Sequence, residues 1–560
     1  MNLMSLPSIS CSSSSSSPSQ FSSHSIRSNS AIHSSLQPFY HRSLSLRLSL
    51  SLKPQQLHRI RSAATHVVAS AIADVQKIDR SSNSLAEDAV LPISQTENSE
   101  DRRKFDWNSH WYPVAIAANL DKRLPHAATI MGHDLVVWWD RIGGTWQVFK
   151  DKCPHRLAPL SEGRISEEGH LQCSYHGWKF SPCSGSCSFI PQAPADGPKV
   201  HTSKRACATP YPSLEQQGLV WFWPDPKEEA RSLAASRLPP KVAELDDPSF
   251  THQWIMRDMP FGFEVLIENL MDPSHVPFAH HKLQGDRNKA NPIALTVGKV
   301  EPSGFEGQQE RGNVSFIAPC FFIYGGSLDK TGTKTMQSEA SKESQENHAL
   351  EKKKKQVLLV FWCLPISPGK SRLIWNFPRN FGLWLNNVIP TWLNHLQRML
   401  VLDSDMYLLH CMENKIQEAG TWETVCYLPT LADTFVIAFR SWLRLYGGHP
   451  EWGSKQLSNT LPPTTSKEQL MDRYSSHVKQ CPDCMNALNF LRGAEVFMQA
   501  LSIASVAILA IASLKPMPII NASSVNIGCF AVFCCVASRM IPHFIQKNYF
   551  FHDYIHAHVK

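Results

Sequence analysis

Two short loops, each with one cysteine and one histidine, constrain the fold of this chain more than any other feature of its sequence. The first loop reads Cys153-x-His155, the second reads Cys173-x2-His176, and seventeen residues separate His155 from Cys173. Thiolate and imidazole groups are protein ligands of zinc and of iron–sulfur clusters. We therefore expect both loops to lie at one tip of a small domain and to bind one metal centre together.

The distribution of these four ligands favours an iron–sulfur cluster over zinc. Ordinary zinc fingers with two cysteines and two histidines pair cysteine with cysteine and histidine with histidine. Here each loop supplies one of each, which sorts as two thiolates on one iron and two imidazoles on the other. Pro154, Arg156, Gly177 and Trp178 also flank the ligands, and a zinc knuckle needs none of them.

The pattern C-x-H-x17-C-x2-H resembles that of Rieske [2Fe-2S] proteins, in which two histidines replace two cysteines. Rieske proteins of the quinol-oxidising complexes carry one further cysteine in each loop, and Ala158 and Tyr175 stand at those two positions here. The loops therefore resemble those of Rieske oxygenases, which implies electron delivery for oxygen activation. By this resemblance the cluster ligands are Cys153, His155, Cys173 and His176.

A second candidate metal site lies in the stretch ENLMDPSHVPFAHH, which contains N-x2-D-x2-H-x4-H beginning at residue 269. It resembles the catalytic motif of Rieske oxygenases, by which His275 and His280 bind a mononuclear Fe(II). Asp272 would carry the electron from the Rieske histidine of a neighbouring subunit. His281 is a rival ligand, because sequence alone does not separate adjacent histidines. Residues five apart lie about 140° apart on a helix, so we expect the helix to break at Pro277.

The third iron ligand should be a carboxylate, since such sites combine two histidines with one acid. The stretch LDSDMYLLH offers Asp403 and Asp405, which lie on different faces of a helix because they are two residues apart. The family pattern places the acid immediately before an apolar helical run. This favours Asp405, with Asp403 as the alternative.

The chain changes character several times along its length. Residues 105–230 predict a small all-β domain, with strands in HDLVVWWDRIGGTWQVFKD and GLVWFWP. Residues 251–450 mix helical and strand-like segments and predict an α+β catalytic domain, interrupted by a polar, disordered insertion at about 327–356. Residues 451–490 predict a linker that contains a C-x2-C motif. The whole chain is therefore predicted to be α+β.

The first 73 residues predict a chloroplast transit peptide, followed by a linker over 74–104. This leader contains 23 serines and six basic residues, and no acidic residue precedes Asp74. An ordinary disordered tail is the alternative, and a secretory signal is disfavoured because no apolar core follows the start. The leader supplies +6 of the net charge of +7, so the rest of the chain offers no electrostatic support for nucleic-acid binding.

Two apolar segments close the chain and predict two transmembrane helices within residues 494–541. Val496–Leu514 has no charge, and a second segment covers about 519–541; each is long enough to span a hydrocarbon core. The alternative is a buried hairpin in a soluble domain. Arg492, Arg539 and Lys547 flank the outer ends against Lys515 in the loop, so the large domains are predicted to face the stroma.

The remaining cysteines give one further hypothesis. Cys481 and Cys484 form a C-x2-C motif, in which one thiol commonly has a lowered pKa. We expect a redox-regulatory pair addressed by thioredoxin, with two ordinary structural thiols as the alternative. Cys183 and Cys187 are close enough in sequence to pair, but are expected to be free thiols.

Together, the leader, the Rieske loops, the histidine motif, the C-x2-C motif and the apolar hairpin resemble the plant pheophorbide a oxygenase family. This family also includes chlorophyllide a oxygenase, the Tic55 import component and the protochlorophyllide-dependent translocon component. CPHRLAPLSEGRI, IPQAP, DPSHVPFAHH and HDYIHAH carry the likeness. The resemblance implies a helix-grip catalytic domain, a head-to-tail homotrimer and a location at the inner envelope or thylakoid membrane.

The resemblance also implies an activity. Reduced ferredoxin would supply electrons, with ferredoxin reductase and NADPH behind it, because no Gly-rich flavin or NAD site is present. O2 would then hydroxylate a planar hydrophobic aromatic substrate, either a chlorophyll-related tetrapyrrole or a flavonoid. The alternative is a non-enzymatic redox-sensing or electron-transfer component of the chloroplast import translocon.

Overall fold

The computed structural model describes residues 105–310, 312–327, 355–453, 460–514 and 522–559, all within one compact unit of residues 94–560. The predicted transit peptide, the linker over 74–104 and most of the predicted insertion lie outside the described residues. The two ends of the insertion are adjacent in space, because Ser327 pairs with Gln356 across two antiparallel strands. The insertion therefore connects two neighbouring strands of one sheet.

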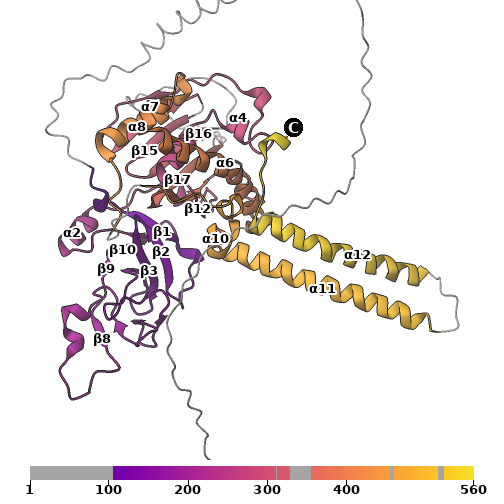
Figure 1. The fold of residues 1–560 in the computed structure, drawn as a ribbon, viewed down its shortest axis with the longest axis horizontal. Helices are drawn as coiled ribbons and strands as arrows, with labels where there is room; N and C mark the ends of the chain where they lie inside the picture. The colour runs from indigo at the N-terminus through magenta and orange to yellow at the C-terminus, as the bar shows by residue number, and fades with distance from the viewer. Residues whose placement is uncertain (1–104, 311, 328–354, 454–459, 515–521, 560) are drawn as a thin grey trace, which may run out of the picture. The chain divides into compact units, whose positions relative to one another are not determined.

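The first domain consists of three small antiparallel sheets (Figure 1). The first sheet, in the order β1-β11-β10, contains β1 (Tyr112–Ile116), β10 (Ser213–Gln216) and β11 (Leu219–Phe222). The second, in sequence order, contains β2 (His126–Ile130), β3 (His133–Asp140), β4 (Thr145–Lys150) and β9 (Pro210–Tyr211). The third contains the short strands β5 (Arg164–Ile165), β6 (Leu171–Gln172), β7 (Lys179–Phe180) and β8 (Cys187–Phe189).

The two Cys/His loops lie over a separate hydrophobic cluster. Trp138 of β3 and Phe149 of β4 extend from the second sheet and are fully buried in this cluster together with Leu160, Leu171 and Phe180. Leu171 and Phe180 are paired across β6 and β7, on either side of the second loop. Burial of these large apolar side chains, at roughly 1.5–3 kcal/mol each, gives both loops a common rigid base.

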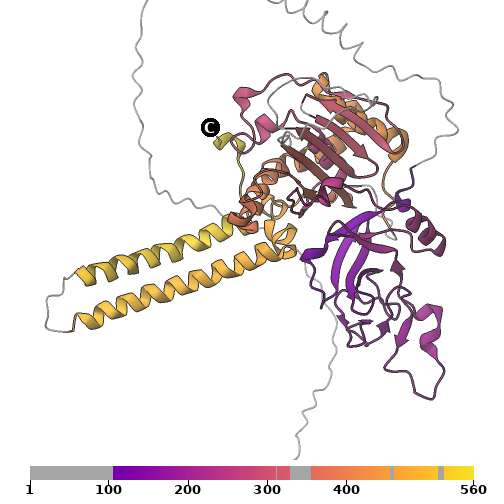
Figure 2. The same cartoon turned by 180° about the vertical axis from the view of Figure 1, so that it is seen from behind.

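The catalytic domain is built on a seven-stranded antiparallel sheet in the order β12-β18-β17-β16-β15-β14-β13 (Figures 1 and 2). Its strands are β12 (Ile255–Met259), β13 (Thr296–Val297), β14 (Gly304–Gln309), β15 (Gly312–Ile317), β16 (Phe321–Ser327), β17 (Gln356–Ser367) and β18 (Lys370–Asn376). Three helices matter for the site: α3 (Phe263–Met271), α6 (Thr391–Ala419) and α8 (Thr434–Trp442).

Aromatic packing holds α8 against the sheet. Phe439 and Trp442 of α8 contact Phe316 of β15, with ring centroids 5.3 Å and 5.2 Å apart. Such edge-on pairs add about 0.5–1.5 kcal/mol to the burial of the rings. The predicted α+β class and the all-β first domain are confirmed.

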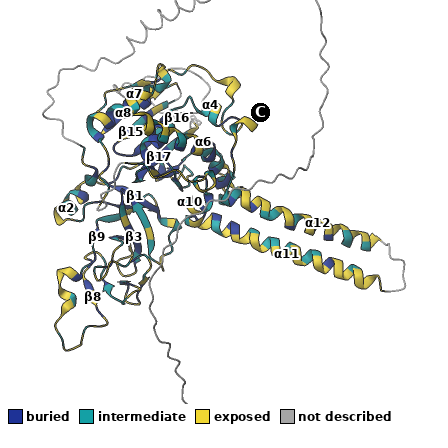
Figure 3. Ribbon diagram, in the orientation of Figure 1, coloured by how far each residue is buried: buried dark blue, intermediate teal, exposed yellow. Residues whose placement is uncertain are grey.

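Two long helices close the chain, α11 (Pro482–Ala512) and α12 (Ala522–Ile545), and they lie side by side (Figures 1 and 2). Ser502 of α11 donates a hydrogen bond to the carbonyl oxygen of Ala531 in α12 (3.0 Å). Only 6 % and 17 % of the most apolar stretches of these helices is buried, and Figure 3 shows them largely exposed. A buried core hairpin would have the opposite pattern, so long, apolar and exposed helices favour membrane insertion.

The linker predicted over 451–490 is wrong in its last part. Helix α11 begins at Pro482, 14 residues before the apolar run at Val496. Cys481 is the residue that precedes the helix and Cys484 lies in its first turn. Proline is well tolerated at the first position of a helix, where its missing N–H leaves no bond unmade, so the C-x2-C motif starts a helix.

Candidate metal centres and substrate pocket

The two Cys/His loops have the same backbone geometry. In the first, the N–H of Leu157 donates to the carbonyl oxygen of Cys153 (2.9 Å), and the N–H of Cys153 donates to that of Ala158 (2.8 Å). In the second, Gly177 and Trp178 stand at the equivalent positions, with distances of 3.0 Å and 2.9 Å. Leu157 and Gly177 both have positive φ, at 66° and 75°. Each loop is thus a tight turn with its cysteine at the base.

The ligands of these loops separate by type. Cys153 and Cys173 are buried, and burial raises the pKa of the Cys153 thiol to about 12, with a further contribution from Cys173. His155 and His176 lie nearer the surface, with ring centroids 4.5 Å apart, and Trp178 stacks on His155 at 4.7 Å. Two thiols below and two imidazoles above fit a [2Fe-2S] cluster that has one iron on each side.

The second site brings together the side chains of His275, His280 and Asp405, the last of which lies on α6. His275 and His280 have their Nε2 atoms 3.2 Å apart, and Oδ2 of Asp405 lies 3.9 Å and 3.2 Å from these two atoms. The three ligand atoms lie within 4.8 Å of one another. Two imidazoles and one carboxylate in this arrangement fit a non-haem Fe(II) that keeps open coordination positions.

Hydrogen bonds to the far sides of the two rings fix their tautomers. His280 Nδ1 lies 2.7 Å from the hydroxyl of Ser404, and that hydroxyl donates to the carbonyl oxygen of Val401 (2.6 Å). His280 is therefore the donor at Nδ1. His275 Nδ1 likewise hydrogen-bonds the carbonyl oxygen of Asp272. Both Nε2 atoms are left with a free lone pair on the side of Asp405, where a metal ion would be bound.

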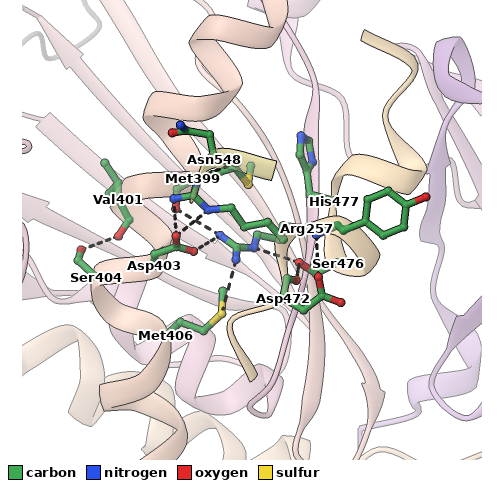
Figure 4. Close-up of polar contacts among 12 residues, drawn as sticks. Arg257, Met399, Val401, Asp403, Ser404, Met406, Asp472, Ser476, His477 and Asn548 are labelled. Carbon is green, nitrogen blue, oxygen red and sulfur yellow. Dashed lines mark hydrogen bonds and ion pairs between the residues drawn. The ribbon is translucent and has the colours of Figure 1, made fainter. Parts of the chain in front are cut away.

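The two candidate acids on α6 point in different directions. Asp403 is fully buried between two arginines, with oxygens 2.7 Å from Arg257 and 2.5 Å from Arg473. Figure 4 shows Arg257 extending to Asp403. Asp405 is two residues further along, which is about 200° around the helix, and it faces the histidines. The geometry therefore favours Asp405 over Asp403 as the iron ligand.

The other predicted residues of this motif take separate positions. His281 is buried, but its Nδ1 accepts a hydrogen bond from the N–H of Arg287 (3.1 Å), so it faces away from the iron site. Asp272 is the capping residue that follows α3, and its carboxylate accepts a hydrogen bond from the N–H of Ser274 (2.7 Å). Because its carbonyl oxygen accepts from His275, Asp272 is one hydrogen bond away from the iron ligands.

The expected helix break at Pro277 is wrong. Helix α3 ends at Met271, and the chain leaves the helical path through Asp272, Pro273 and Ser274 before His275. Pro277 instead lies in the first turn of the short helix α4 (Val276–Ala279), where proline is tolerated. His275 precedes this short helix and His280 follows it, and the single helical turn between them brings their rings together.

A cavity of about 470 Å³ opens directly onto the iron site. Its walls include His275, His280 and Asp405, and the remaining lining is mostly apolar, with aromatic side chains at Phe322, Tyr324, Phe361, Trp375, Phe377, Phe381 and Phe435. This volume lies within the usual range for small-molecule sites. Only two cationic side chains, Arg379 and Arg398, line it among the residues that the structure describes.

The sequence did not reveal the surroundings of the C-x2-C motif. His395 of α6 and His477 lie against Cys481 and Cys484, and all four side chains are buried. His477 precedes Cys481 by four residues, and this H-x3-C-x2-C spacing in the sequence could have indicated a metal site. His395 is 86 residues away from Cys481, so no local spacing could have assigned it.

The comparisons with known proteins agree with this geometry. The family profile of the Rieske [2Fe-2S] domain matches residues 110–209, and that of pheophorbide a oxygenase matches residues 316–422. The chain is 42% identical over 488 residues to protochlorophyllide-dependent translocon component 52 of Arabidopsis thaliana, which covers 81% of this chain and 86% of that protein. It is 41% identical over 485 residues to flavonoid 8-hydroxylase 2 of Ocimum basilicum, with coverages of 85% and 89%.

A third relative, pheophorbide a oxygenase of Arabidopsis thaliana, is 36% identical over 499 residues, with coverages of 83% and 86%. All three relatives are named as chloroplastic proteins. The likeness thus extends over most of the chain and well beyond the metal-binding motifs.

The two positive-φ positions of the loops predict opposite responses to substitution. Gly177→Ala places a Cβ 3.0 Å from Cγ of Pro191 and in a conformation that costs a non-glycine residue about 1–2 kcal/mol. We expect this variant to lose cluster absorption at a lower temperature than the unchanged protein. Leu157→Gly is the control, because Leu157 is 61% exposed and already strained. A Gly177→Ala protein that retains its cluster as well as the Leu157→Gly protein contradicts this account.

The two aspartates on α6 also predict separable effects. Asp405→Ala removes one iron ligand and should eliminate mononuclear iron while leaving the Rieske absorption unchanged. Asp403→Ala leaves two buried guanidinium groups without their carboxylate and should cost about 3–5 kcal/mol. Metal analysis and thermal unfolding measure both effects. Full mononuclear iron in Asp405→Ala, or an unchanged melting temperature in Asp403→Ala, contradicts the assignment.

Proposed function

The chain belongs to the pheophorbide a oxygenase family of chloroplast Rieske oxygenases, and we propose that it hydroxylates a planar aromatic substrate that carries a carboxylate. It is an oxygenase with a Rieske [2Fe-2S] cluster and a mononuclear iron, which uses ferredoxin and O2. The observation that carries the proposal is the aromatic cavity beside His275, His280 and Asp405, with two arginines in its wall.

In this proposal the protein's residues hold and orient two iron centres. When bound, the cluster supplies electrons and the mononuclear iron supplies oxygen activation. Cys153, His155, Cys173 and His176 hold the cluster. His275, His280 and Asp405 hold the mononuclear iron, and Ser404 keeps the His280 ring in the tautomer that can bind it. The aromatic walls of the cavity exclude water and stack on a flat substrate.

The two arginines in the cavity wall indicate which charge the substrate should carry. Arg398 lies seven residues before Asp405 on α6, on the same helix face and about 10 Å along the axis. Its guanidinium lies 4.5 Å from the ring of Phe377, and burial, followed by the charge of Arg379, lowers its pKa. No ion pair to either arginine occurs among the described residues. Both arginines are half-buried, and Arg379 donates a hydrogen bond to Asn386 (2.7 Å). A half-buried guanidinium without an ion pair favours an anionic ligand.

This charge pattern separates the two substrate classes that the relatives suggest. Chlorophyll-related tetrapyrroles without the phytyl ester carry a free propionate carboxylate on a flat macrocycle, and one of the relatives is named for a pheophorbide. Flavonoids, the substrates named for the basil relative, are flat and apolar but have no carboxylate. Arg379 and Arg398 therefore favour the free-acid tetrapyrrole, with the flavonoid as second candidate on the strength of 41% identity.

We further propose that electrons pass between subunits of a homotrimer. Three features at the two sites support this. His155 is an exposed residue. Tyr175 and Leu157 beside the cluster ligands are 59% and 61% exposed, as expected for a surface that contacts a partner. Asp272 is partly exposed and hydrogen-bonds His275, so it can receive the Rieske histidine of the next subunit.

The proposed location follows from α11 and α12. Their exposed apolar surfaces favour a membrane anchor in the inner envelope or thylakoid membrane, with the two iron domains in the stroma, where ferredoxin is reduced. A substrate that partitions into lipid would reach such an enzyme easily. The alternative of a redox sensor without turnover is disfavoured, because a relay needs neither a second iron site nor a cavity beside it.

Turnover with paired substrates tests the proposal. The full chain in detergent is supplied with ferredoxin, ferredoxin reductase and NADPH, and products are read by mass. We expect hydroxylation of a free-acid tetrapyrrole and a KM at least about tenfold higher for Arg398→Met, because a hydrogen bond to a charged group contributes about 1.5–3 kcal/mol. The methyl ester of the same tetrapyrrole should show little difference between the two proteins.

Lys415→Met is the matched control, because Lys415 is an exposed cation on the same helix. It should leave both KM values unchanged. Hydroxylation of flavones but not of the acid would assign the chain to the second substrate class. Absence of product from both classes, with both iron centres present, would favour the sensor.

A further inference from the structure

Four metal-binding side chains outside both iron sites converge where three helical segments meet. His395 comes from α6, His477 follows the short helix α10 (Arg473–Ser476), and Cys481 and Cys484 lie at the start of α11. All four are between 1% and 4% exposed. Their ligand atoms lie within 4.8 Å of one another.

The distances within this cluster match a tetrahedral metal site. Nδ1 of His395 lies 3.5 Å from Sγ of Cys481 and 3.4 Å from Sγ of Cys484, and Nε2 of His477 lies 3.4 Å from Sγ of Cys484. Around a tetrahedral zinc, with bonds of about 2.3 Å to sulfur and 2.0–2.1 Å to nitrogen, the sulfur–nitrogen separation is about 3.6 Å. The donors are therefore already spaced for a single ion.

The outer side of His477 is also arranged for metal binding. Its Nδ1 donates a hydrogen bond to the carbonyl oxygen of Met256 (2.7 Å), which leaves the lone pair of Nε2 facing the cysteines. A backbone carbonyl in this position is a common partner of metal-binding histidines, since it fixes both the tautomer and the orientation of the ring. Met256 belongs to β12, so the catalytic sheet itself positions this ligand.

Direct hydrogen bonds alone account poorly for the cluster. Sulfur is only a weak hydrogen-bond donor and acceptor, so the three close sulfur–nitrogen contacts compensate the buried imidazoles poorly. The surroundings are mostly apolar, because Leu396, Val478, Leu488 and Ile545 belong to the same buried cluster. Tyr549 is also in this cluster, and its buried hydroxyl makes no hydrogen bond among the described residues. Buried polar groups in such a place need full compensation. An ion bound by all four would provide it.

We propose that His395, His477, Cys481 and Cys484 form a structural zinc site. Two thiolates and two imidazoles in tetrahedral geometry are a ligand set that selects zinc. Four protein ligands and nearly complete burial leave no open position for substrate, so the ion would be structural. In this proposal the two cysteines of the C-x2-C motif are zinc ligands. The sequence instead led us to expect a redox-active pair that thioredoxin reduces.

The site would connect the iron-binding helix to the C-terminal hairpin. His395 lies ten residues before Asp405 on α6, about 15 Å along the helix axis. Cys481 and Cys484 lie at the base of α11. An ion bound between them would hold the helix that carries the third iron ligand against the start of the first membrane helix.

Metal analysis of the full chain tests this proposal. The protein is purified in detergent, treated with EDTA to remove exposed ions, and analysed for zinc and iron by mass spectrometry. We expect about one zinc per chain in the unchanged protein, and almost none in Cys481→Ser and His477→Gln. Cys183→Ser is the control, since Cys183 is an exposed cysteine outside the cluster, and it should retain its zinc.

A second measurement applies if the variants fail to fold. Growth with cobalt in place of zinc should give the unchanged protein the visible absorption of tetrahedral cobalt bound to thiolates, in addition to the Rieske bands. Zinc-free protein whose Cys481 and Cys484 react as thiols, or form a disulfide that thioredoxin reduces, would overturn the proposal and support redox regulation. X-ray absorption that shows zinc without sulfur ligands would also overturn it.

Discussion

One buried carboxylate sets the geometry on which the rest of the catalytic domain depends. Asp403 lies between Arg257 of β12 and Arg473 of α10, with no solvent exposure, so α6 is fixed both to the sheet and to the segment before the membrane helices. Such a buried group of three charges resists rearrangement, because separating any one side chain from the others leaves buried charges without a partner. Fixing Asp403 fixes the rotation of α6, and this rotation turns Asp405 toward the histidines.

Local patterns in the sequence predict the four candidate cluster ligands and the histidine pair of the second site. Each Rieske loop is a six-residue turn, and its ligands, its positive-φ residue and its hydrogen bonds all lie within one stretch of chain. The histidine pair likewise spans six residues. The choice between Asp403 and Asp405 could not be made in this way, because helical periodicity says only that they face apart. The deciding partner, Arg257, is 146 residues distant, and only the fold brings it to Asp403.

The sequence was insufficient to place the helix break near the histidines, where two rules about proline compete. It was also insufficient to identify the histidines around the C-x2-C motif, because one of them is remote in the chain. Proline breaks helices in their interior but is tolerated in the first turn, so Pro277 gave the wrong place for a break that occurs at Asp272, the residue before Pro273. The C-x2-C motif was interpreted by its two cysteines alone. His477 was within reach of a spacing argument, whereas His395 is 86 residues from the nearer cysteine and faces it only because α6 passes the start of α11.

Helix α6 thereby connects the mononuclear iron site, the substrate cavity and the proposed zinc site. Its residue 395 faces the cysteines at the base of α11, residue 398 and residue 405 face the cavity, and residue 403 faces the buried arginines. A helix held at several points along one length has little freedom to rotate or slide. The helical rise then sets the spacing between the backbone positions of Arg398, which would bind a carboxylate, and Asp405, which would hold the iron. In the proposed function, this spacing would favour substrates whose acid group lies at a matching distance from the carbon to be oxidised.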